Sequence, residues 1–143
     1  MKIEPLNFKT YLSFIKNSAN SKSFQSLFAQ VDGLEKDITK KGKLSCAFFT
    51  SSVLKIFSQI KNLHATVSGI IKDLEKSGWK EIKIPQKGSI LIWESKNGHR
   101  HIGFYLGNNK AISNNSQKRT PQIHHYTFNN KRKIESIFHK NFS

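Results

Sequence analysis

The spacing of apolar residues changes once along this chain, and that change limits the possible folds more than any other feature. Before Gly78, apolar residues recur every three or four positions, as in Phe8, Tyr11, Leu12 and Ile15. This is the spacing of one helix face. After Gly78, apolar residues alternate with polar ones or form short runs bounded by turn residues, as strands do. Helices followed by successive antiparallel strands predict an α+β domain.

The apolar periodicity predicts three further helices in the first half of the chain. A short helix covers residues 24–31 and ends at Asp32–Gly33. The longest covers residues 46–60, and Ser45 is its expected N-cap. The last covers residues 67–76 and ends at a Ser-Gly pair, which is a common helix stop. All the helices therefore precede the strands.

The second half of the chain predicts an antiparallel sheet of about five strands. Ile82 and Ile84 alternate with lysines at its start, and Pro85–Gly88 forms the first turn. Asn108–Asn109 has the composition of a hairpin turn. The main predicted strands cover residues 89–93, 101–107, 110–114, 123–128 and 133–138.

Residues 1–143 are expected to form a single domain. A chain of this length can bury a core without disulfides or structural metals. No internal repeat and no low-complexity linker divides it. Within the domain, we interpret residues 1–40 as a helical N-terminal extension and residues 44–138 as the core, which contains the candidate functional residues Cys46 and His101.

The chain is strongly basic. It has 24 Lys and Arg residues against 9 Asp and Glu, which gives a formal net charge of +15. Such a charge attracts nucleic acid, acidic lipids or anionic cell-wall polymers. The lysines are spread along the chain and do not gather on one recognition helix. An anionic polymer is therefore an expected class of partner, and the charge does not choose among polymers.

Composition also excludes several classes of protein. A single cysteine rules out an intramolecular disulfide and a multi-cysteine metal framework. No run approaches 18 consecutive apolar residues, so no membrane-spanning helix is expected. The first residues lack the apolar segment and cleavage site of a secretory signal. We therefore expect a cytoplasmic protein, with release by lysis or non-classical export left open.

The only cysteine, Cys46, stands in the predicted first turn of the longest helix. A helix N-terminus carries roughly +0.5 of an elementary charge, which favours a thiolate over a thiol. Its unpaired backbone N–H groups can also hold an oxyanion. Cys46 is therefore the expected nucleophile, and the alternative is a buried cysteine that acts as a small hydrophobe.

A thiol nucleophile needs a base, and His101 is the best placed of the six histidines. It opens a predicted strand, and Gly103 follows two residues later on the same face. A glycine in a strand leaves space for a substrate or for another closely packed backbone. This position makes His101 the candidate general base.

Three segments occur in the order that a known family shows. Residues 45–49 (SCAFF) begin a helix, and residues 85–93 (PQKGSILIW) form a turn that leads into a strand. Residues 101–110 (HIGFYLGNNK) contain the pattern His-x-Gly-x-Tyr-x-Gly. Together these segments resemble the NlpC-type cysteine hydrolases, which are small papain-like enzymes related to the cysteine/histidine-dependent amidohydrolases and peptidases. The resemblance covers residues 44–114.

The resemblance implies a papain-like α+β fold in which N-terminal helices pack on a C-terminal antiparallel sheet. It implies a cysteine peptidase or amidase with Cys46 as nucleophile and His101 as general base. The implied substrate is a peptide or a peptidoglycan fragment. No metal and no other cofactor is expected.

The chain departs from the family pattern near the expected nucleophile. Ser45 stands where the family usually has Asp, and Ala47–Phe48 stands where it has Ser-Gly. Gly88–Ser89 replaces a common Gly-Asp pair. Residues 32–44 contain no tyrosine, although the family commonly has one upstream of the cysteine. These departures concern the contacts that a substrate would make.

The third residue, which would orient His101, depends on the register of the following hairpin. A two-residue loop pairs Gly103 with Asn114 and puts Asn114 on the face of His101, whereas a three-residue loop puts Ser113 there. Asparagine is the better chemical choice, because its amide oxygen accepts from the imidazole N–H and fixes the tautomer. Asn114 is therefore favoured over Ser113.

Two other kinds of function stay open. His99 and His101, with His124 and His125, could form a metal site, but no second cysteine or carboxylate cluster supports it. A catalytically inactive or non-enzymatic basic module could instead bind nucleic acid or another anionic polymer through its cationic and aromatic side chains. Reactivity of the Cys46 thiol distinguishes this module from the enzyme.

Overall fold

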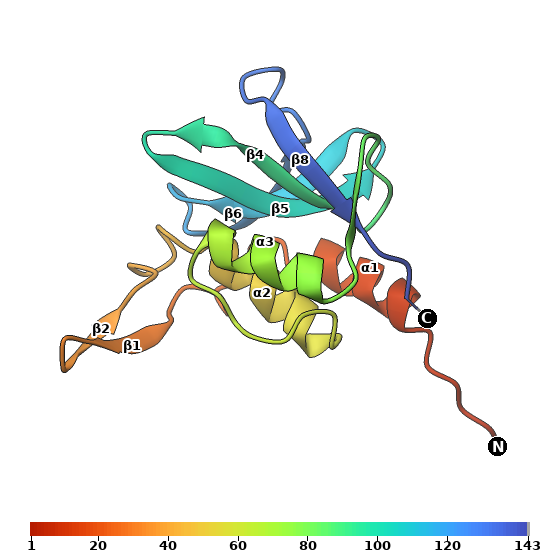
Figure 1. The fold of residues 1–143 in the computed structure, drawn as a ribbon, viewed down its shortest axis with the longest axis horizontal. Helices are drawn as coiled ribbons and strands as arrows, with labels where there is room; N and C mark the ends of the chain where they lie inside the picture. Colours follow the sequence, from red (N-terminus) through yellow and green to blue (C-terminus); the bar gives the residue numbers. More distant parts are fainter. Residues whose placement is uncertain (143) are drawn as a thin grey trace.

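A computed structural model describes residues 1–142, which form a layer of three helices packed under an antiparallel sheet (Figure 1). The helices are α1 (Asn7–Asn17), α2 (Cys46–Ile56) and α3 (Val67–Lys76). The six-stranded sheet has the order β3-β8-β4-β5-β6-β7, and a separate hairpin pairs β1 with β2. The strands are β1 (Phe28–Val31), β2 (Leu34–Asp37), β3 (Lys80–Ile82), β4 (Ile90–Lys96), β5 (His99–Gly107), β6 (Lys110–Asn115), β7 (Thr120–His125) and β8 (Ile134–His139). The predicted α+β fold is confirmed.

Both faces of the sheet are covered, which explains the continuous apolar run in β4. Ile90 and Ile92 face the helices, whereas Leu91 and Trp93 belong to a second apolar cluster on the outer face. All four side chains are fully buried. A strand that is buried on both sides has no reason to alternate apolar with polar residues.

Helix α1 belongs to the main core. Tyr11 and Ile15 are fully buried, and the Tyr11 hydroxyl donates a hydrogen bond to the Gly88 carbonyl at 2.7 Å. The Tyr11 ring also lies edge-on to Phe104 of β5. Helix α1 therefore ties the turn before β4 to the helical layer.

The prediction of a helix over residues 24–31 is wrong. Residues 28–37 form the β1–β2 hairpin, which projects away from the helices and the sheet (Figure 1). Asp32 and Gly33 both have positive φ, at 53° and 80°, as a type I′ turn requires. The apolar side chain of Phe28 is 67% exposed. This segment therefore gains no stability from burying an apolar helix face in the core.

The boundaries of other elements also differ from the prediction. Helix α2 ends at Ile56, four residues before the predicted end at Ile60. Ile60 is buried, so the apolar spacing continues past the end of the helix and made the predicted helix too long. Ser45 occupies the N-cap position, but its hydroxyl donates to the Phe24 carbonyl at 2.7 Å and does not cap α2. Strand β7 covers Thr120–His125, earlier than the predicted residues 123–128. None of the helices among residues 1–142 is long and apolar enough to span a membrane.

Candidate active site

One groove brings the start of α2 next to the open end of the sheet. Cys46 and His101 both line it. One wall comes from residues 65–68 before and at the start of α3, and another from the β4–β5 turn at residues 95–100. Asn114–Gln117 at the end of β6 complete the lining on the other side. The groove therefore contains both residues that the sequence suggested as a nucleophile and a base.

Cys46 is the first residue of α2, and its side chain is half-buried. The ladder between β5 and β6 ends at the Gly103–Ser113 pair, and just beyond it the Ile102 backbone amide lies beside the thiol. Burial raises the pKa of Cys46, while the Ile102 and Ala47 amides oppose this rise. The resting thiol is therefore held protonated next to donors that would stabilise its anion.

His101 lies on the outer face of the sheet against an aromatic ring. Its imidazole packs on Trp93 with a centroid separation of 5.3 Å. Burial, followed by the charges of Arg132 and His124, lowers the pKa of His101 to about 3. The ring is therefore neutral at physiological pH and has one free lone pair for a proton.

The residue that contacts His101 is Ser113. The Ser113 Oγ lies 2.8 Å from Nε2 of His101. Gly103 pairs with Ser113, because a bulge between Tyr105 and Gly107 adds one residue to β5 and shifts the register. The register expected for a two-residue loop is therefore wrong, even though the turn itself has two residues.

Asn114 consequently points to the opposite face of the sheet. Its Nδ2 donates to the Gly42 carbonyl at 2.7 Å, and the side chain is only 5% exposed. This bond fixes the loop that precedes Cys46. Asn114 therefore supports the loop before Cys46. The preference for Asn114 as the partner of His101 is wrong, because its side chain lies on the other face of the sheet.

The sequence did not identify the contact between Ser113 and His124. The Ser113 Oγ lies 2.7 Å from Nε2 of His124, and Nδ1 of His124 lies 2.8 Å from the His125 carbonyl oxygen. His124 pairs with Ala111 across β6 and β7, which places it on the outer face. The signal was the presence of polar residues at positions 101, 113 and 124 of three successive strands.

Arg132 is a second residue whose position the sequence did not reveal. Its Nε donates to the Glu94 carbonyl at 2.9 Å and its Nη2 to the His99 carbonyl at 2.8 Å. These bonds hold the guanidinium at the groove, where its positive charge acts on both Cys46 and His101. In the sequence, Arg132 was only one member of a short basic run.

The groove is cationic. Its lining includes no Asp or Glu of the described chain, and its four Lys and Arg side chains are Lys43, Lys96, Arg100 and Arg132. Across residues 1–142, no three His, Cys, Asp or Glu side chains are grouped to hold a metal ion. The four cationic side chains of the lining attract molecules that carry negative charge.

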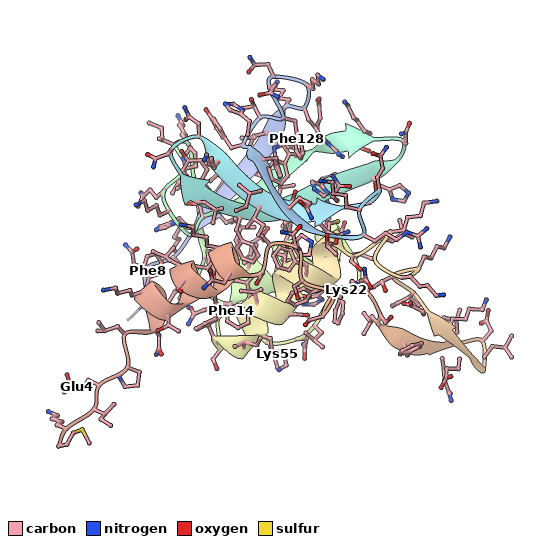
Figure 2. The ribbon with its side chains drawn as sticks, turned by 180° about the vertical axis from the view of Figure 1, so that it is seen from behind. Glu4, Phe8, Phe14, Lys22, Lys55 and Phe128 are labelled. Carbon is pink, nitrogen blue, oxygen red and sulfur yellow. The ribbon has the colours of Figure 1, made fainter. Side chains whose placement is uncertain are left out.

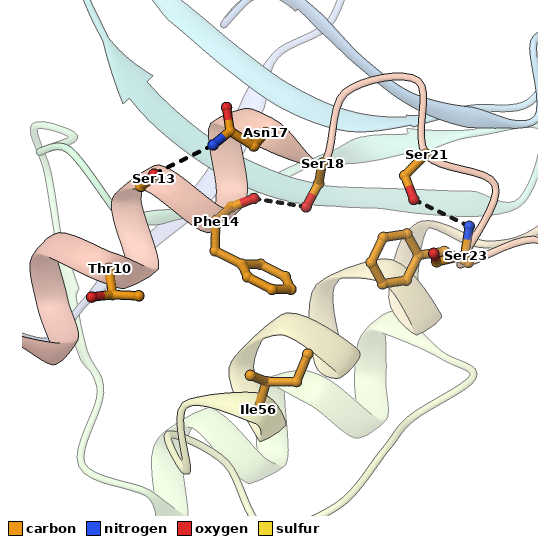
Figure 3. A pocket seen from close by; sticks show the side chains of 9 residues that line it. Thr10, Ser13, Phe14, Asn17, Ser18, Ser21, Ser23 and Ile56 are labelled. Carbon is orange, nitrogen blue, oxygen red and sulfur yellow. Dashed lines mark hydrogen bonds between the residues drawn. The ribbon is translucent and has the colours of Figure 1, made fainter.

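A second hollow lies between α1, the end of α2 and the loop that follows α1 (Figure 3). Phe14 and Ile56 line it, together with several serine hydroxyls. Three of its polar side chains are bound locally, since Ser18 donates to the Phe14 carbonyl and Asn17 donates to the Ser13 hydroxyl. Among the described residues, its lining contains no titratable side chain.

A cysteine that begins a helix packed on an antiparallel sheet, with a histidine from that sheet in the same groove, is the arrangement of papain-like cysteine hydrolases. The family model for NlpC/P60 matches residues 25–137. The chain belongs to the NlpC/P60 family, whose members are generally hydrolases of the cysteine peptidase and amidase class. No curated protein sequence matches this chain significantly.

Proposed function

We propose that this protein is a cysteine peptidase or amidase that hydrolyses an amide bond, with Cys46 as nucleophile, His101 as general base and Ser113 as the residue that binds His101. The observation that carries the proposal is the shared groove of Cys46 and His101. The family of the chain supports the class of reaction, and its substrates suggest peptides of the peptidoglycan type.

The reaction begins with a neutral pair. Burial raises the pKa of the Cys46 thiol and lowers that of His101, so both groups are uncharged before substrate binds. As the Cys46 sulfur attacks the amide carbonyl, its proton moves to His101. A C–S bond forms, and the carbonyl π electrons move onto oxygen to give a tetrahedral oxyanion.

Backbone N–H groups at the start of α2 stabilise that oxyanion. The positive end of the helix adds to their effect. His101 then gives its proton to the leaving nitrogen, so the C–N bond breaks and a thioester remains. His101 next takes a proton from water as the water oxygen attacks the thioester carbon. The C–S bond then breaks, His101 returns the proton to the sulfur, and the acid is released with the Cys46 thiol restored.

The charge of the groove supports an anionic substrate. Four cationic side chains, with no carboxylate in the described lining, would attract a peptide that carries carboxylates. Arg132 is the cation whose charge acts on both Cys46 and His101, and it is best placed to bind a carboxylate near the scissile bond. An anionic polymer such as a cell-wall glycan with peptide side chains fits the same lining.

The test uses peptidoglycan digests as substrate and mass spectrometry of the released peptides as readout. Wild-type protein is expected to release new amino termini, and Cys46→Ala and His101→Ala are expected to release none. His125→Asn is the matched control, because it removes a neighbouring imidazole whose Nδ1 accepts only from Thr127. Cleavage by Cys46→Ala would refute the proposal.

A second measurement separates the enzyme from a binding module. Alkylation of Cys46 by iodoacetamide near pH 7 is expected to be faster in the wild type than in His101→Ala, because only the wild type has a base in the groove that can take the thiol proton. An unreactive thiol, together with salt-dependent retention on DNA or anionic polymer that Cys46→Ala leaves unchanged, would instead establish a non-enzymatic basic module.

A further inference from the structure

Ser113 lies between two imidazole rings on the outer face of the sheet. Its Oγ is 2.8 Å from Nε2 of His101 and 2.7 Å from Nε2 of His124. A hydroxyl has a single proton, so it donates to one ring and accepts from the other. The direction of this donation decides which nitrogen of His101 keeps its lone pair.

His124 fixes the direction through its other ring nitrogen. Its Nδ1 is 2.8 Å from the His125 carbonyl oxygen, which can only accept, so Nδ1 carries the proton. Burial lowers the pKa of His124 below its ordinary value of 6.5, and the ring is neutral at neutral pH. A neutral imidazole has one N–H, so Nε2 of His124 accepts the proton of the Ser113 hydroxyl.

This leaves one role for the hydroxyl oxygen toward His101. Since the Ser113 proton points to His124, Ser113 Oγ accepts from the Nε2–H of His101. Nδ1 of His101 then keeps the lone pair and is the nitrogen that can take the thiol proton. Ser113 alone would not fix this tautomer, because its hydroxyl could also donate to Nε2 of His101. The ring proton of His101 would then lie on Nδ1, and no lone pair on Nδ1 would be free to accept the thiol proton.

We propose that His124 is a positioning residue: it accepts the Ser113 hydroxyl proton and so sets His101 in the tautomer whose Nδ1 is free to act as base. The inference rests on the proposed function for the role of His101 as base. The bonded series His101, Ser113, His124 and the His125 carbonyl is called the histidine relay below.

The packing around His124 holds its ring in the orientation that the histidine relay needs. Phe128 stacks on it with a centroid separation of 4.0 Å and an interplanar angle of 12°. Trp93 lies 5.6 Å away and also contacts His101, so it touches both imidazoles. Phe128 lies on the side of the sheet away from Phe8 and Phe14 of α1 (Figure 2). Packing on the ring faces therefore limits the rotation of both imidazoles.

The first test is imidazole 15N NMR of the wild-type protein, which distinguishes an N–H from a bare ring nitrogen. We expect His124 to carry its proton on Nδ1 and His101 to carry its proton on Nε2. A proton on Nδ1 of His101, or on Nε2 of His124, at neutral pH would overturn the inference. This measurement needs no variant, so it decides the matter even if a substitution unfolds the protein.

The second test uses His124→Leu, which removes the acceptor and keeps an apolar side chain. His101 is expected to become a mixture of tautomers, and the rate of Cys46 alkylation by iodoacetamide at pH 7 is expected to fall about tenfold. His124→Gln keeps an acceptor for the hydroxyl and is expected to recover much of this rate. Wild-type tautomers and rate in His124→Leu would overturn the inference.

A double variant separates the histidine relay from a general packing effect. In Ser113→Ala the hydroxyl is absent, so adding His124→Leu is expected to lower the alkylation rate by no more than about twofold further. If the alkylation rate of the double variant instead fell by the product of the two single losses, the two residues would act independently and the relay would be contradicted. Lys110→Gln is the control, because Lys110 is exposed at the other end of β6 and does not line the groove, and its rate is expected to equal that of the wild type.

The outcomes keep the two proposals apart. If His101 and His124 have the expected tautomers but the protein cleaves no amide bond, the proposed function is wrong and the hydrogen bonding of the histidine relay stands. Cleavage by a protein whose His101 carries its proton on Nδ1 would end the relay and leave the proposed function intact.

Discussion

Asp73 of α3 holds one wall of the groove in place, and its substitution by asparagine tests how. Its carboxylate accepts from the backbone amides of Lys61 and Asn62 at 2.9 and 3.0 Å. It also accepts from the Ser77 hydroxyl at 3.0 Å and lies 2.7 Å from Nε2 of His64. These bonds fix the segment that leads into residues 65–68 of the groove wall. Asp73→Asn should therefore lower stability and loosen that wall.

The magnitude follows from the pKa of Asp73. Burial by itself would raise this pKa, but the hydrogen bonds lower it from 3.8 to about 2. The side chain is only 6% exposed, so water screens these bonds little. A pKa difference of nearly two pH units between the unfolded and folded states corresponds to about 2 kcal/mol of stability at pH 7. Asparagine also turns an N–H toward at least one donor, so the loss should be no smaller than about 2 kcal/mol.

The sign of the pH dependence follows from the lowered pKa. The contribution of the carboxylate is complete above the unfolded pKa of 3.8 and is lost as the pH falls toward 2. Urea unfolding of the wild type and Asp73→Asn should therefore give their largest difference near pH 7 and a smaller one below pH 4. Asp32→Asn is the matched control, since Asp32 is exposed in a turn with φ 53° that asparagine tolerates. A difference below 0.5 kcal/mol at pH 7 (about a quarter of the expected value) would refute the role of Asp73.

Two further substitutions test the site itself. In Gly103→Ala the new Cβ would lie 2.6 Å from the Ser113 Cβ, so the free energy of unfolding should fall by about 1–3 kcal/mol and Cys46 alkylation should slow. Wild-type stability in urea would show that the two strands are not this close. Burial raises the pKa of Cys46 and the Arg132 charge opposes it, so Arg132→Gln should shift the pH profile of alkylation to higher pH. Arg119→Gln should leave that profile unchanged, and an unshifted profile in Arg132→Gln would place its charge away from the thiol.

The parts of the fold that depend on long-range burial could be predicted from the sequence. The helical periodicity before Gly78 and the apolar runs after it indicate which side chains are buried in the core. This pattern does not depend on where each helix or strand begins and ends. The run at residues 89–93 was predictable as a buried strand because both of its faces are covered. Cys46 could be placed at the start of α2 for the same reason, because the apolar face of that helix begins there.

The β1–β2 hairpin shows where periodicity fails. The apolar residues of the segment fit a helix face, but only Phe24 reaches the core, and the hairpin starts after it. The Asp32–Gly33 pair was interpreted as a helix stop, although an Asp-Gly pair between two short strands is also a strong signal for a type I′ turn. When the apolar residues of a segment stay exposed, the turn residues determine its conformation. The spacing of its apolar residues then predicts little about its secondary structure.

Arg132 could not have been found by any local pattern. Its place at the groove depends on the turn that joins β7 to β8 and on two backbone carbonyls from distant strands. In the sequence it is flanked by Lys131 and Lys133, and the three have the same charge. Only the position of these backbone carbonyls distinguishes Arg132, whose charge acts on Cys46, from its two basic neighbours.

The choice between Ser113 and Asn114 turns on a single bulge residue, and it changes the chemistry that the site needs. The Gly107 that precedes the turn has φ 90°, the conformation that a bulge glycine adopts, so the sequence did contain a signal for the shifted register. With Asn114 opposite His101, an amide oxygen would fix the tautomer without help. With Ser113 there, a hydroxyl that can donate in either direction needs a second acceptor, and His124 on the next strand supplies it. The register shift and the second histidine are therefore linked, and a variant that restores the unshifted register should no longer depend on His124.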